Sequence, residues 1–182
     1  MADEITLQCQ FASSSSGVDI NYVLTNLGQK PIFAFTPLPE YRNDRFEPDP
    51  KAVYIHMTGT GFLTFSKELW RTPQTVKVYR PEVPFLTRVA AGRSLEETIH
   101  LPAPLVVKYP YLNYGTPHAP PPRKSTSSGA VFVVGYLDDE RLVQPSTVRA
   151  SRELFTVEYG SGITHQQRVR SNVSSLSALV LS

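Results

Sequence analysis

The stretch "NYVLTNLGQKPIFAFTPLP", residues 21–39, decides the fold class of this chain. Tyr22 and Leu24 alternate with polar residues, which is the pattern of a strand that buries one face. Asn26 and the glycine two residues later are residue types that turns favour, and Pro31 then opens a second apolar run. The stretch therefore predicts two β-strands joined by a turn, and no catalytic motif lies within it.

The same alternation recurs on both sides of this stretch. One face of the segment "VDINYVLTN" carries only apolar or aromatic side chains, and so does one face of "AVYIHMT". The residues on these faces are Val18, Ile20, Tyr22, Leu24, Val53, Ile55 and Met57. Many short strands with one buried face are what two packed antiparallel sheets require. We therefore predict an all-β chain folded as an antiparallel β-sandwich with long proline-rich loops.

Turn residues divide the chain into short predicted strands. The strands cover residues 5–11, 18–25, 31–36, 52–58, 62–66, 75–79, 85–89, 94–101, 130–136, 154–159 and 166–173. In "GRSLEETIHLP" the spacing of Ser94 and Glu97 also matches a helix-capping box, but the β-branched pair Thr98 and Ile99 favours a strand. "AVFVVGY" is apolar on both faces, so we expect a central strand in which Gly135 marks a bulge or a close backbone approach. A helical turn in "SKELWRTP" stays open.

Length, charge and cysteine content narrow the class of protein. The 182 residues, 41% of them hydrophobic, predict a single domain over residues 1–182, with two small domains as the alternative. A formal charge of +2 gives no support for a nucleic-acid or membrane partner. The lone Cys9 precludes an intramolecular disulfide, and we expect it to be a buried small hydrophobe. The N-terminus lacks the regions of a secretory signal, and no run is long enough to span a bilayer, so we expect a soluble, cytoplasmic protein.

Two irregular segments carry the candidate binding residues. The segment "YPYLNYGTPHAPPPRKSTSSG", residues 109–129, predicts a long mobile loop, which is either a tolerated insertion or a site that docks a protein partner. A proline-rich extended chain with flanking tyrosines is a ready recognition element. The second segment, "PLPEYRNDRFEPDP", follows the opening stretch and is expected to be a loop. The candidate partner-binding residues are Tyr41, Arg42, Arg45, Phe46, Tyr109, Tyr111 and Tyr114.

The sequence offers no clear catalytic, metal-binding or cofactor-binding motif. The segment "YGSGITH" holds Ser161 near His165, but we interpret it as a hairpin turn between strands. His56 and His100 lie on polar faces of predicted strands and would meet only if those strands were neighbours. We predict that the chain is not an enzyme and binds no cofactor and no metal.

Two segments within residues 18–101 resemble a known family. These are "VDINYVLTNLGQKPIFAF", a strand that ends in asparagine before a glycine turn and a second strand, and "FLTRVAAGRSLEETIHL", two strands around an Ala-Gly turn. They are similar to immunoglobulin-like sandwiches of bacterial cytoplasmic proteins, the intracellular proteinase inhibitor type among them. The resemblance implies an immunoglobulin-like fold. No reactive-site loop is identified, and no inhibitory residue is assigned.

The functional hypothesis is a non-enzymatic β-sandwich that binds a protein partner through a sheet edge or through the 109–129 loop. One alternative is a module that binds a small molecule or carbohydrate with Tyr41, Trp70 and Tyr79. Another is an unrecognised hydrolase built around Ser161 and His165. Because sandwiches leave strand edges exposed, a homodimer formed through one of them is a further option.

Overall fold

Two layers of β-strands form the body of the protein. The structure, a computed structural model, describes residues 4–42, 44–58, 61–74, 77–112, 123–148 and 150–181. One layer is an antiparallel sheet in the order β1–β2–β9, formed by β1 (Ile5–Ser14), β2 (Gly17–Asn26) and β9 (Arg93–Pro102). The residues around Ser94 therefore form a strand, as predicted, and not a capped helix.

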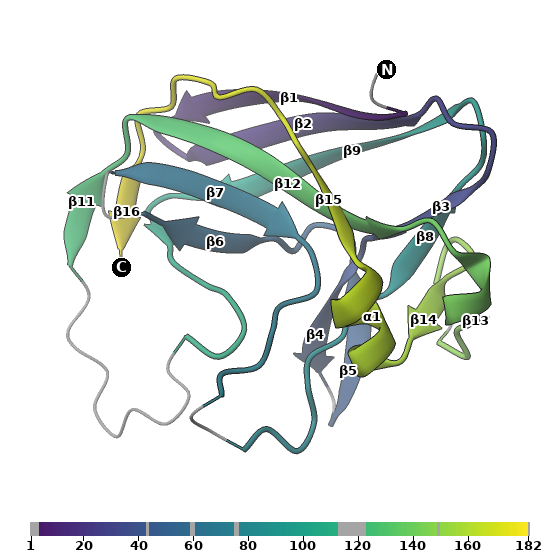
Figure 1. Cartoon of the computed structure of the whole chain (residues 1–182). Coiled ribbons are helices and arrows are strands. Elements are labelled where there is room, and N and C mark those ends of the chain that lie inside the picture. Colours follow the sequence, from purple (N-terminus) through teal and green to yellow (C-terminus); the bar gives the residue numbers. More distant parts are fainter. Residues whose placement is uncertain are drawn as a thin grey trace.

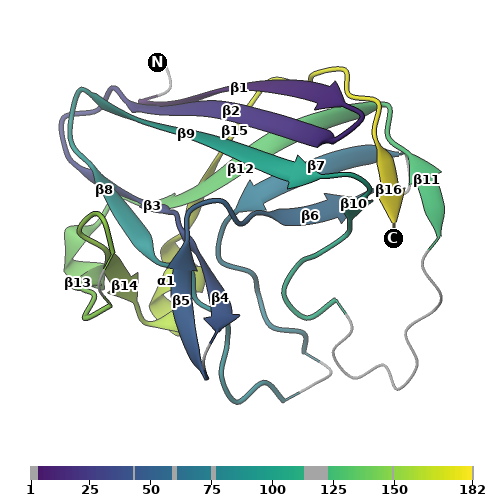
Figure 2. The same ribbon diagram turned by 180° about the vertical axis from the view of Figure 1, so that it is seen from behind.

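The second layer is a larger sheet in the order β13–β14–β8–β3–β12–β7–β6, with β15 also paired to β12. Its strands are β3 (Ile32–Phe35), β6 (Tyr54–Met57), β7 (Phe62–Lys67), β8 (Leu86–Val89), β12 (Gly129–Leu137), β13 (Val143–Pro145), β14 (Phe155–Val157) and β15 (Gln167–Arg170). The first sheet lies behind β12, β7 and β6 in Figure 1 and in front of them in Figure 2. The chain is thus mostly β, with its strands in facing layers.

The prediction of antiparallel pairing is wrong for residues 105–106, which pair parallel to residues 180–181, and for β12. This strand runs parallel to β7, from Gly129 opposite Phe62 to Val134 opposite Lys67. A parallel pair needs a long connection between its strands, and some sixty residues separate β7 from β12 along the chain. Nearly all of β12 is buried, which is typical of parallel strands covered on both faces.

Smaller elements complete the fold. A two-stranded sheet is formed by β4 (Leu38–Arg42) and β5 (Arg45–Asp49), and a three-stranded one by β10 (Leu105–Val106), β16 (Leu179–Leu181) and β11 (Lys124–Thr126). The helical elements are η1 (Glu140–Leu142) and α1 (Tyr159–His165). None of the described helices is long and apolar enough to cross a membrane.

Three local predictions are wrong. The "YGSGITH" segment is the helix α1, because Gly162 lets the helix approach Leu69 so closely that a Cβ atom there would lie 2.6 Å from Leu69 Cδ2. Part of the predicted 109–129 loop is the strand β11, which pairs with β16. In the predicted strand 75–79, residues 77–79 are not a strand, and residues 75 and 76 lie outside the described residues.

The main core fills the space between the two layers. The alternating face of β2 lies in it, as predicted, and Tyr22 stacks on Phe132 of β12 with ring centroids 4.5 Å apart. A second apolar cluster, which includes Phe35, Leu69 and Val157, packs beneath α1 and the β13–β14 hairpin. Gly135 makes room for a side chain and not for the backbone approach that was predicted, because a Cβ there would lie 2.3 Å from Gln166 Oε1. The Gln166 amide is held by both backbone groups of Leu69.

Asn26 fixes the turn of the opening stretch. Its side chain is fully buried, and its Nδ2 atom donates to the carbonyl oxygens of Lys30 at 2.8 Å and Val89 at 3.0 Å. Its Oδ1 atom accepts a hydrogen bond from the Gly28 N–H at 3.0 Å. A single amide thus closes the turn after β2 and ties it to the end of β8, which sets where β3 begins.

The substitution Asn26→Ala tests this role. It leaves two carbonyls and one N–H without their buried partner, so we expect the free energy of unfolding to fall by about 2–4 kcal/mol. Chemical denaturation measures this loss. The control is Asn21→Ala, which removes an exposed amide that accepts a hydrogen bond from Thr98 and should cost no more than about 0.5 kcal/mol. Equal losses in the two variants would contradict the role given to Asn26.

Candidate functional site

The predicted loop "PLPEYRNDRFEPDP" is a regular β-hairpin, which corrects the expectation of an irregular segment. Its strands β4 and β5 pair from Leu38 opposite Asp49 to Arg42 opposite Arg45. Asp44 turns the chain with a φ of 63°, a conformation that aspartate and asparagine adopt more readily than most residues. The hairpin projects from the sandwich near its lower margin in both Figure 1 and Figure 2.

Pro39 and Pro48 made these two strands look like a loop in the sequence, but both prolines fit the pairing pattern of the hairpin. A two-residue turn makes Arg42 and Arg45 a hydrogen-bonded pair, so alternate pairs along the ribbon are not hydrogen-bonded. Pro39 lies opposite Pro48 at one of these alternate positions. The missing N–H of each proline would have pointed away from the partner strand, and the ribbon loses no hydrogen bond.

The hairpin tip, which we define as Tyr41, Arg42, Arg45 and Phe46, brings four of the predicted partner-binding residues together. Tyr41 and Phe46 form another directly opposed pair, with ring centroids 5.4 Å apart and an interplanar angle of 66°. Tyr41 is 62% exposed and Phe46 is 39% exposed. Two large aromatic side chains are thus displayed to solvent on a regular ribbon.

The charges of the tip are balanced within the hairpin. Arg45 Nε lies 2.8 Å from Glu47 Oε1, and Arg42 pairs with Glu40 and, at 3.5 Å, with Asp49. Both guanidinium groups stay more than half exposed. These pairs contribute little to stability because water screens them, but they limit how freely each arginine moves.

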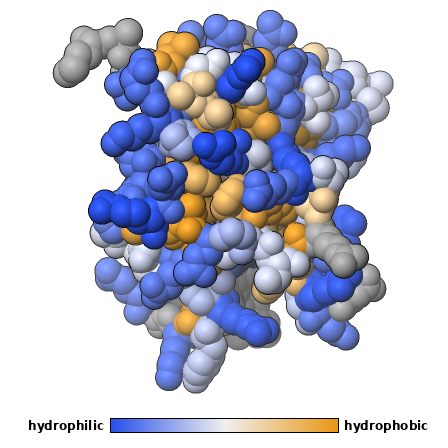
Figure 3. All heavy atoms as spheres, turned by 90° about the vertical axis from the view of Figure 1, so that its right-hand side faces the viewer, coloured by the Kyte–Doolittle hydropathy of each residue, from blue (hydrophilic) through white to orange (hydrophobic). Residues whose placement is uncertain are grey.

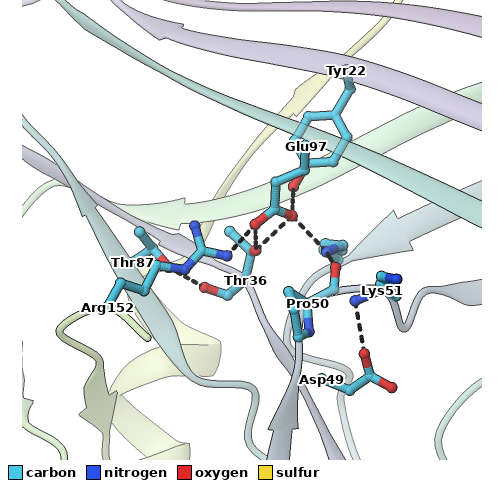
Figure 4. A network of polar contacts seen from close by, with 9 residues as sticks. Tyr22, Thr36, Asp49, Pro50, Lys51, Thr87, Glu97 and Arg152 are labelled. Carbon is cyan, nitrogen blue, oxygen red and sulfur yellow. Dashed lines mark hydrogen bonds and ion pairs between the residues drawn. The ribbon is translucent and has the colours of Figure 1, made fainter. Parts of the chain in front are cut away.

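A buried ionic cluster lies at the base of the hairpin. We define the Glu97 cluster as Tyr22, Thr36, Lys67, Glu97 and Arg152. Figure 4 shows Tyr22, Thr36 and Arg152 converging on the Glu97 carboxylate. Lys67 Nζ donates to that carboxylate at 2.8 Å, Tyr22 Oη at 2.5 Å and Thr36 Oγ1 at 3.0 Å, and Arg152 makes a further ion pair. The Lys67 side chain is fully buried and that of Glu97 is 8% exposed.

The cluster fixes both ends of the hairpin. Thr36 precedes β4, and its carbonyl accepts a hydrogen bond from Thr87 on β8. Pro50 follows β5, and its carbonyl accepts from Lys67 Nζ at 2.5 Å. The tip therefore projects from a base that is bonded to three strands of the sandwich.

Electrostatics favours the charged form of Glu97. Burial alone would raise its pKa, but Lys67 and the hydrogen bonds from Lys67, Tyr22 and Arg152 outweigh burial and hold the pKa of Glu97 below its ordinary value of 4.5. Burial and then the Glu97 carboxylate raise the pKa of Tyr22, so its hydroxyl stays protonated and donates. The cluster is a set of donors saturating one buried carboxylate.

Sequence reasoning missed Glu97 and Lys67, although a signal was present. Glu97 alternates with Leu95 and Ile99 on the face of β9 that joins the core, and Lys67 follows Phe65 at the same spacing on β7. A single charge on an otherwise apolar strand face needs a buried partner. Two opposite charges in such positions would have suggested a pair.

The tyrosines predicted to dock a partner are placed differently from the tip. Tyr109 stacks on Trp70 with ring centroids 5.0 Å apart, and Tyr111 Oη accepts a hydrogen bond from the Glu82 N–H at 3.0 Å. Tyr109 and Tyr111 thus pack against the body of the protein. Tyr114 lies outside the described residues.

Two clefts flank the hairpin. One, of about 650 Å³, is lined by Phe46, Pro48, Pro50, Arg152 and neighbouring residues. The other, of about 910 Å³, brings Glu40 and Asp49 of the hairpin to the same groove as Tyr109 and Tyr111, over apolar residues of β6, β9 and β10. The two predicted segments are therefore neighbours. Tyr109 and Tyr111 are half-buried, whereas Tyr41 and Phe46 of the hairpin are exposed.

The residues of the alternative hypotheses do not gather into one site. Trp70 is half-buried among Tyr54, His56 and Tyr109, while Tyr41 and Tyr79 are exposed on separate segments. His165 Nδ1 lies 2.9 Å from the Ser161 carbonyl oxygen, one helical turn away, and no bond to the Ser161 hydroxyl is seen.

His56, His100 and Cys9 have separate surroundings. His100 pairs with Asp19 at 2.7 Å, whereas the His56 ring lies against Trp70 and Tyr109. Within the described part of the chain, no group of three or more histidine, cysteine or carboxylate side chains is arranged to hold a metal. Cys9 packs against the main core, and burial raises the pKa of its thiol to about 12.

The end of the sandwich that lies opposite the β10–β16–β11 sheet offers a weaker candidate surface for binding. Figure 3 views the end that carries the β2–β3 and β8–β9 turns and the β13–β14 hairpin, where hydrophobic patches are separated by hydrophilic side chains. The cleft there, beside Lys30, Asp138 and Arg168, is mainly polar. Interaction sites usually need a continuous apolar patch, and this end divides its apolar surface.

The substitution Glu97→Gln tests the buried cluster. The pKa of Glu97 is lower in the folded chain than in the unfolded chain, so its stabilising effect is complete above about pH 4.5 and is lost as the pH falls through the folded-state value. Near pH 7 the variant should lose about 3–5 kcal/mol, because Lys67 keeps a buried charge without its partner.

Denaturant titrations from pH 7 to pH 3 give the measurement. The stability of the wild type should approach that of Glu97→Gln as the pH falls below 4.5. Glu96→Gln is the matched control, because Glu96 is the exposed neighbour on β9 and should follow the wild type throughout. Wild type and Glu97→Gln curves that stay parallel over this range would contradict the charged cluster.

Comparisons with known proteins give no family for this chain: no family description, no curated protein and no solved structure matches it. The resemblance to immunoglobulin-like inhibitor domains stays a prediction, because the described strands show a mostly β chain without identifying that family. Function must therefore be inferred from the geometry of the described residues.

Proposed function

We propose that this chain is a non-enzymatic, immunoglobulin-like β-sandwich module that binds a protein partner with the tip of the β4–β5 hairpin. The observation that carries the proposal is the exposed Tyr41–Phe46 pair on a hairpin whose base is bonded to the Glu97 cluster. We place the protein in the cytoplasm in this proposal, since its single cysteine fits a reducing compartment.

The residue types of the tip suit a protein interface. Tyrosine and arginine are enriched among the residues that contribute most to binding, and aromatic rings bury a large area with few rotatable bonds. Arg42 and Arg45 surround the rings with groups that can hydrogen-bond at the rim. A flat partner surface would bury Tyr41 and Phe46 at the centre of such a contact.

The fixed base of the hairpin favours affinity. A loop that orders only on binding loses conformational entropy at that step, and this cost reduces the affinity. Here the paired strands and the bonds at Thr36 and Pro50 order the hairpin in the free protein. The clefts on both sides of the hairpin offer further contact area to the same partner.

The 109–129 segment enters the proposal in a reduced role. Because Tyr109 and Tyr111 pack internally, they support the groove beside the hairpin more directly than they bind a partner. A deletion that tests this segment should spare β11, since Lys124–Thr126 pairs with β16.

Capture experiments with the immobilised full chain test the tip. The double substitution Tyr41→Ser and Phe46→Ser should reduce the amount of the specifically bound protein about tenfold or more. Tyr79→Ser is the matched control, because Tyr79 is 81% exposed on another loop and its loss should leave capture unchanged.

Thermal unfolding of each variant shows whether the fold is retained. Both variants change exposed side chains, so each should stay within about 1 kcal/mol of the wild type. Capture that is equal for the tip variant and the wild type would contradict the proposal, and so would equal losses in the tip variant and the Tyr79 variant.

A further inference from the structure

Strand β1 is an unusual edge of the first sheet. It is ten residues long, and the chain carries no charged residue and no proline between Glu4 and Asp19. Exposed edges normally bear charges, prolines or coverings that prevent pairing with other chains. An edge of this length without such residues is open to a further strand.

The other edges of the two main sheets carry those protective features. At the opposite edge of the same sheet, β9 contains four charged or titratable residues and ends in Pro102. Ile55 of β6 is bridged by Lys108 through two hydrogen bonds, and the short strand β13 ends in Pro145. Strand β15 has arginines at two of its four positions. Among the described strands, β1 is thus the long edge that lacks protection.

The hairpin register determines which backbone groups of β1 face outward. Ser14 lies opposite Gly17 across a two-residue turn, which makes them a hydrogen-bonded pair. From there, hydrogen-bonded and non-hydrogen-bonded pairs alternate along the two strands. Glu4 and Leu27 fall at a hydrogen-bonded position in this alternation, and the Leu27 N–H does donate to the Glu4 carbonyl, at 2.7 Å. The outward N–H and C=O groups therefore belong to Ile5, Leu7, Cys9, Phe11 and Ser13, and no backbone partner for them occurs among the described residues.

We propose that β1 pairs antiparallel with β1 of a second copy of this chain, about a two-fold axis at Cys9. This register places Cys9 opposite Cys9, Leu7 opposite Phe11 and Ile5 opposite Ser13. Each residue whose backbone N–H and C=O point outward in one copy therefore meets such a residue in the other copy. Antiparallel pairing requires this match of phase. The interface is isologous, as a two-fold dimer demands.

Charge and side-chain chemistry support a second copy as the occupant. No two like charges face each other across the axis, since the paired region is uncharged. On the exposed face Gln8 lies opposite Gln10 of the second copy, and two amides can exchange hydrogen bonds. On the other face Leu7 would meet Phe11, which extends the apolar side of each sandwich.

The dimer leaves the hairpin tip accessible. Figures 1 and 2 both show β1 along the upper margin of the sandwich and the β4–β5 hairpin near the lower margin. Two tips in one dimer would bind a repeated or clustered partner with higher avidity. Dimerisation itself does not depend on the function proposed for the tip.

A charge-swap experiment on the full chain tests the pairing. Because Gln8 faces Gln10 of the second copy, the variant Q8K/Q10K places lysine opposite lysine and should raise the dimer dissociation constant about tenfold or more. The variant Q8K/Q10E places lysine opposite glutamate and should restore dimerisation. Sedimentation equilibrium over a range of concentrations measures the dissociation constant of each.

Disulfide trapping tests the register. In a Cys9→Ala background, a mixture of Q8C and Q10C chains should form a disulfide-linked heterodimer. Residues 8 and 10 would form a non-hydrogen-bonded pair across the new seam, and the Cα atoms of such a pair are about 4.5 Å apart. Either chain alone should cross-link far less, since its two cysteines would be offset by two residues along the strands.

The outcomes separate this inference from the proposed function. A wild type that sediments as a monomer at every concentration would overturn the dimer, and equal dimerisation of Q8K/Q10K and Q8K/Q10E would overturn this edge as its interface. The tip variant Tyr41→Ser with Phe46→Ser should dimerise as the wild type does, whatever its capture result.

Discussion

The structure depends most on one buried carboxylate. Glu97 of β9 faces Lys67 of β7 across the two layers, and Tyr22, Thr36 and Arg152 complete its hydrogen bonds. A charge in an apolar interior is strongly unfavourable unless donors surround it, so each of these residues limits where its own segment of the chain can lie. The sheets can slide or rotate only by breaking several of these contacts together.

This constraint links the core to the surface that we propose for binding. Lys67 also bonds to the Pro50 carbonyl, and Thr36 is bonded to both Glu97 and Thr87, so the residues before β4 and after β5 belong to the same network. Replacing the ionic cluster with apolar side chains of similar volume is often neutral for stability in other proteins. Here such a replacement would also remove the bonds that Thr36 and Pro50 make to the cluster, and we infer that the polar contacts are retained for the orientation of the hairpin.

The sequence predicted the strands that carry a clear pattern of apolar and polar residues. The alternation around Tyr22 identified β2 and its buried face, and the apolar run containing Gly135 identified the central strand β12. The failures have long-range causes. The parallel neighbour of β12 is set by a distant segment, and α1 packs closely on Leu69 because Gly162 has no side chain at that contact. The four tip residues were grouped as candidates because they lie in one short segment, and Pro39 and Pro48 concealed the strands that bring them together.

The opposed prolines of the hairpin prevent a further strand from pairing with its stem. A strand added to either side of this ribbon would need the N–H groups that Pro39 and Pro48 lack. Substitutions at the tip can therefore increase its hydrophobicity or β-propensity without turning the ribbon into a template for aggregation. The tip residues that we propose to contact a partner can therefore vary in sequence while the paired strands and the bonded base of the hairpin keep its shape.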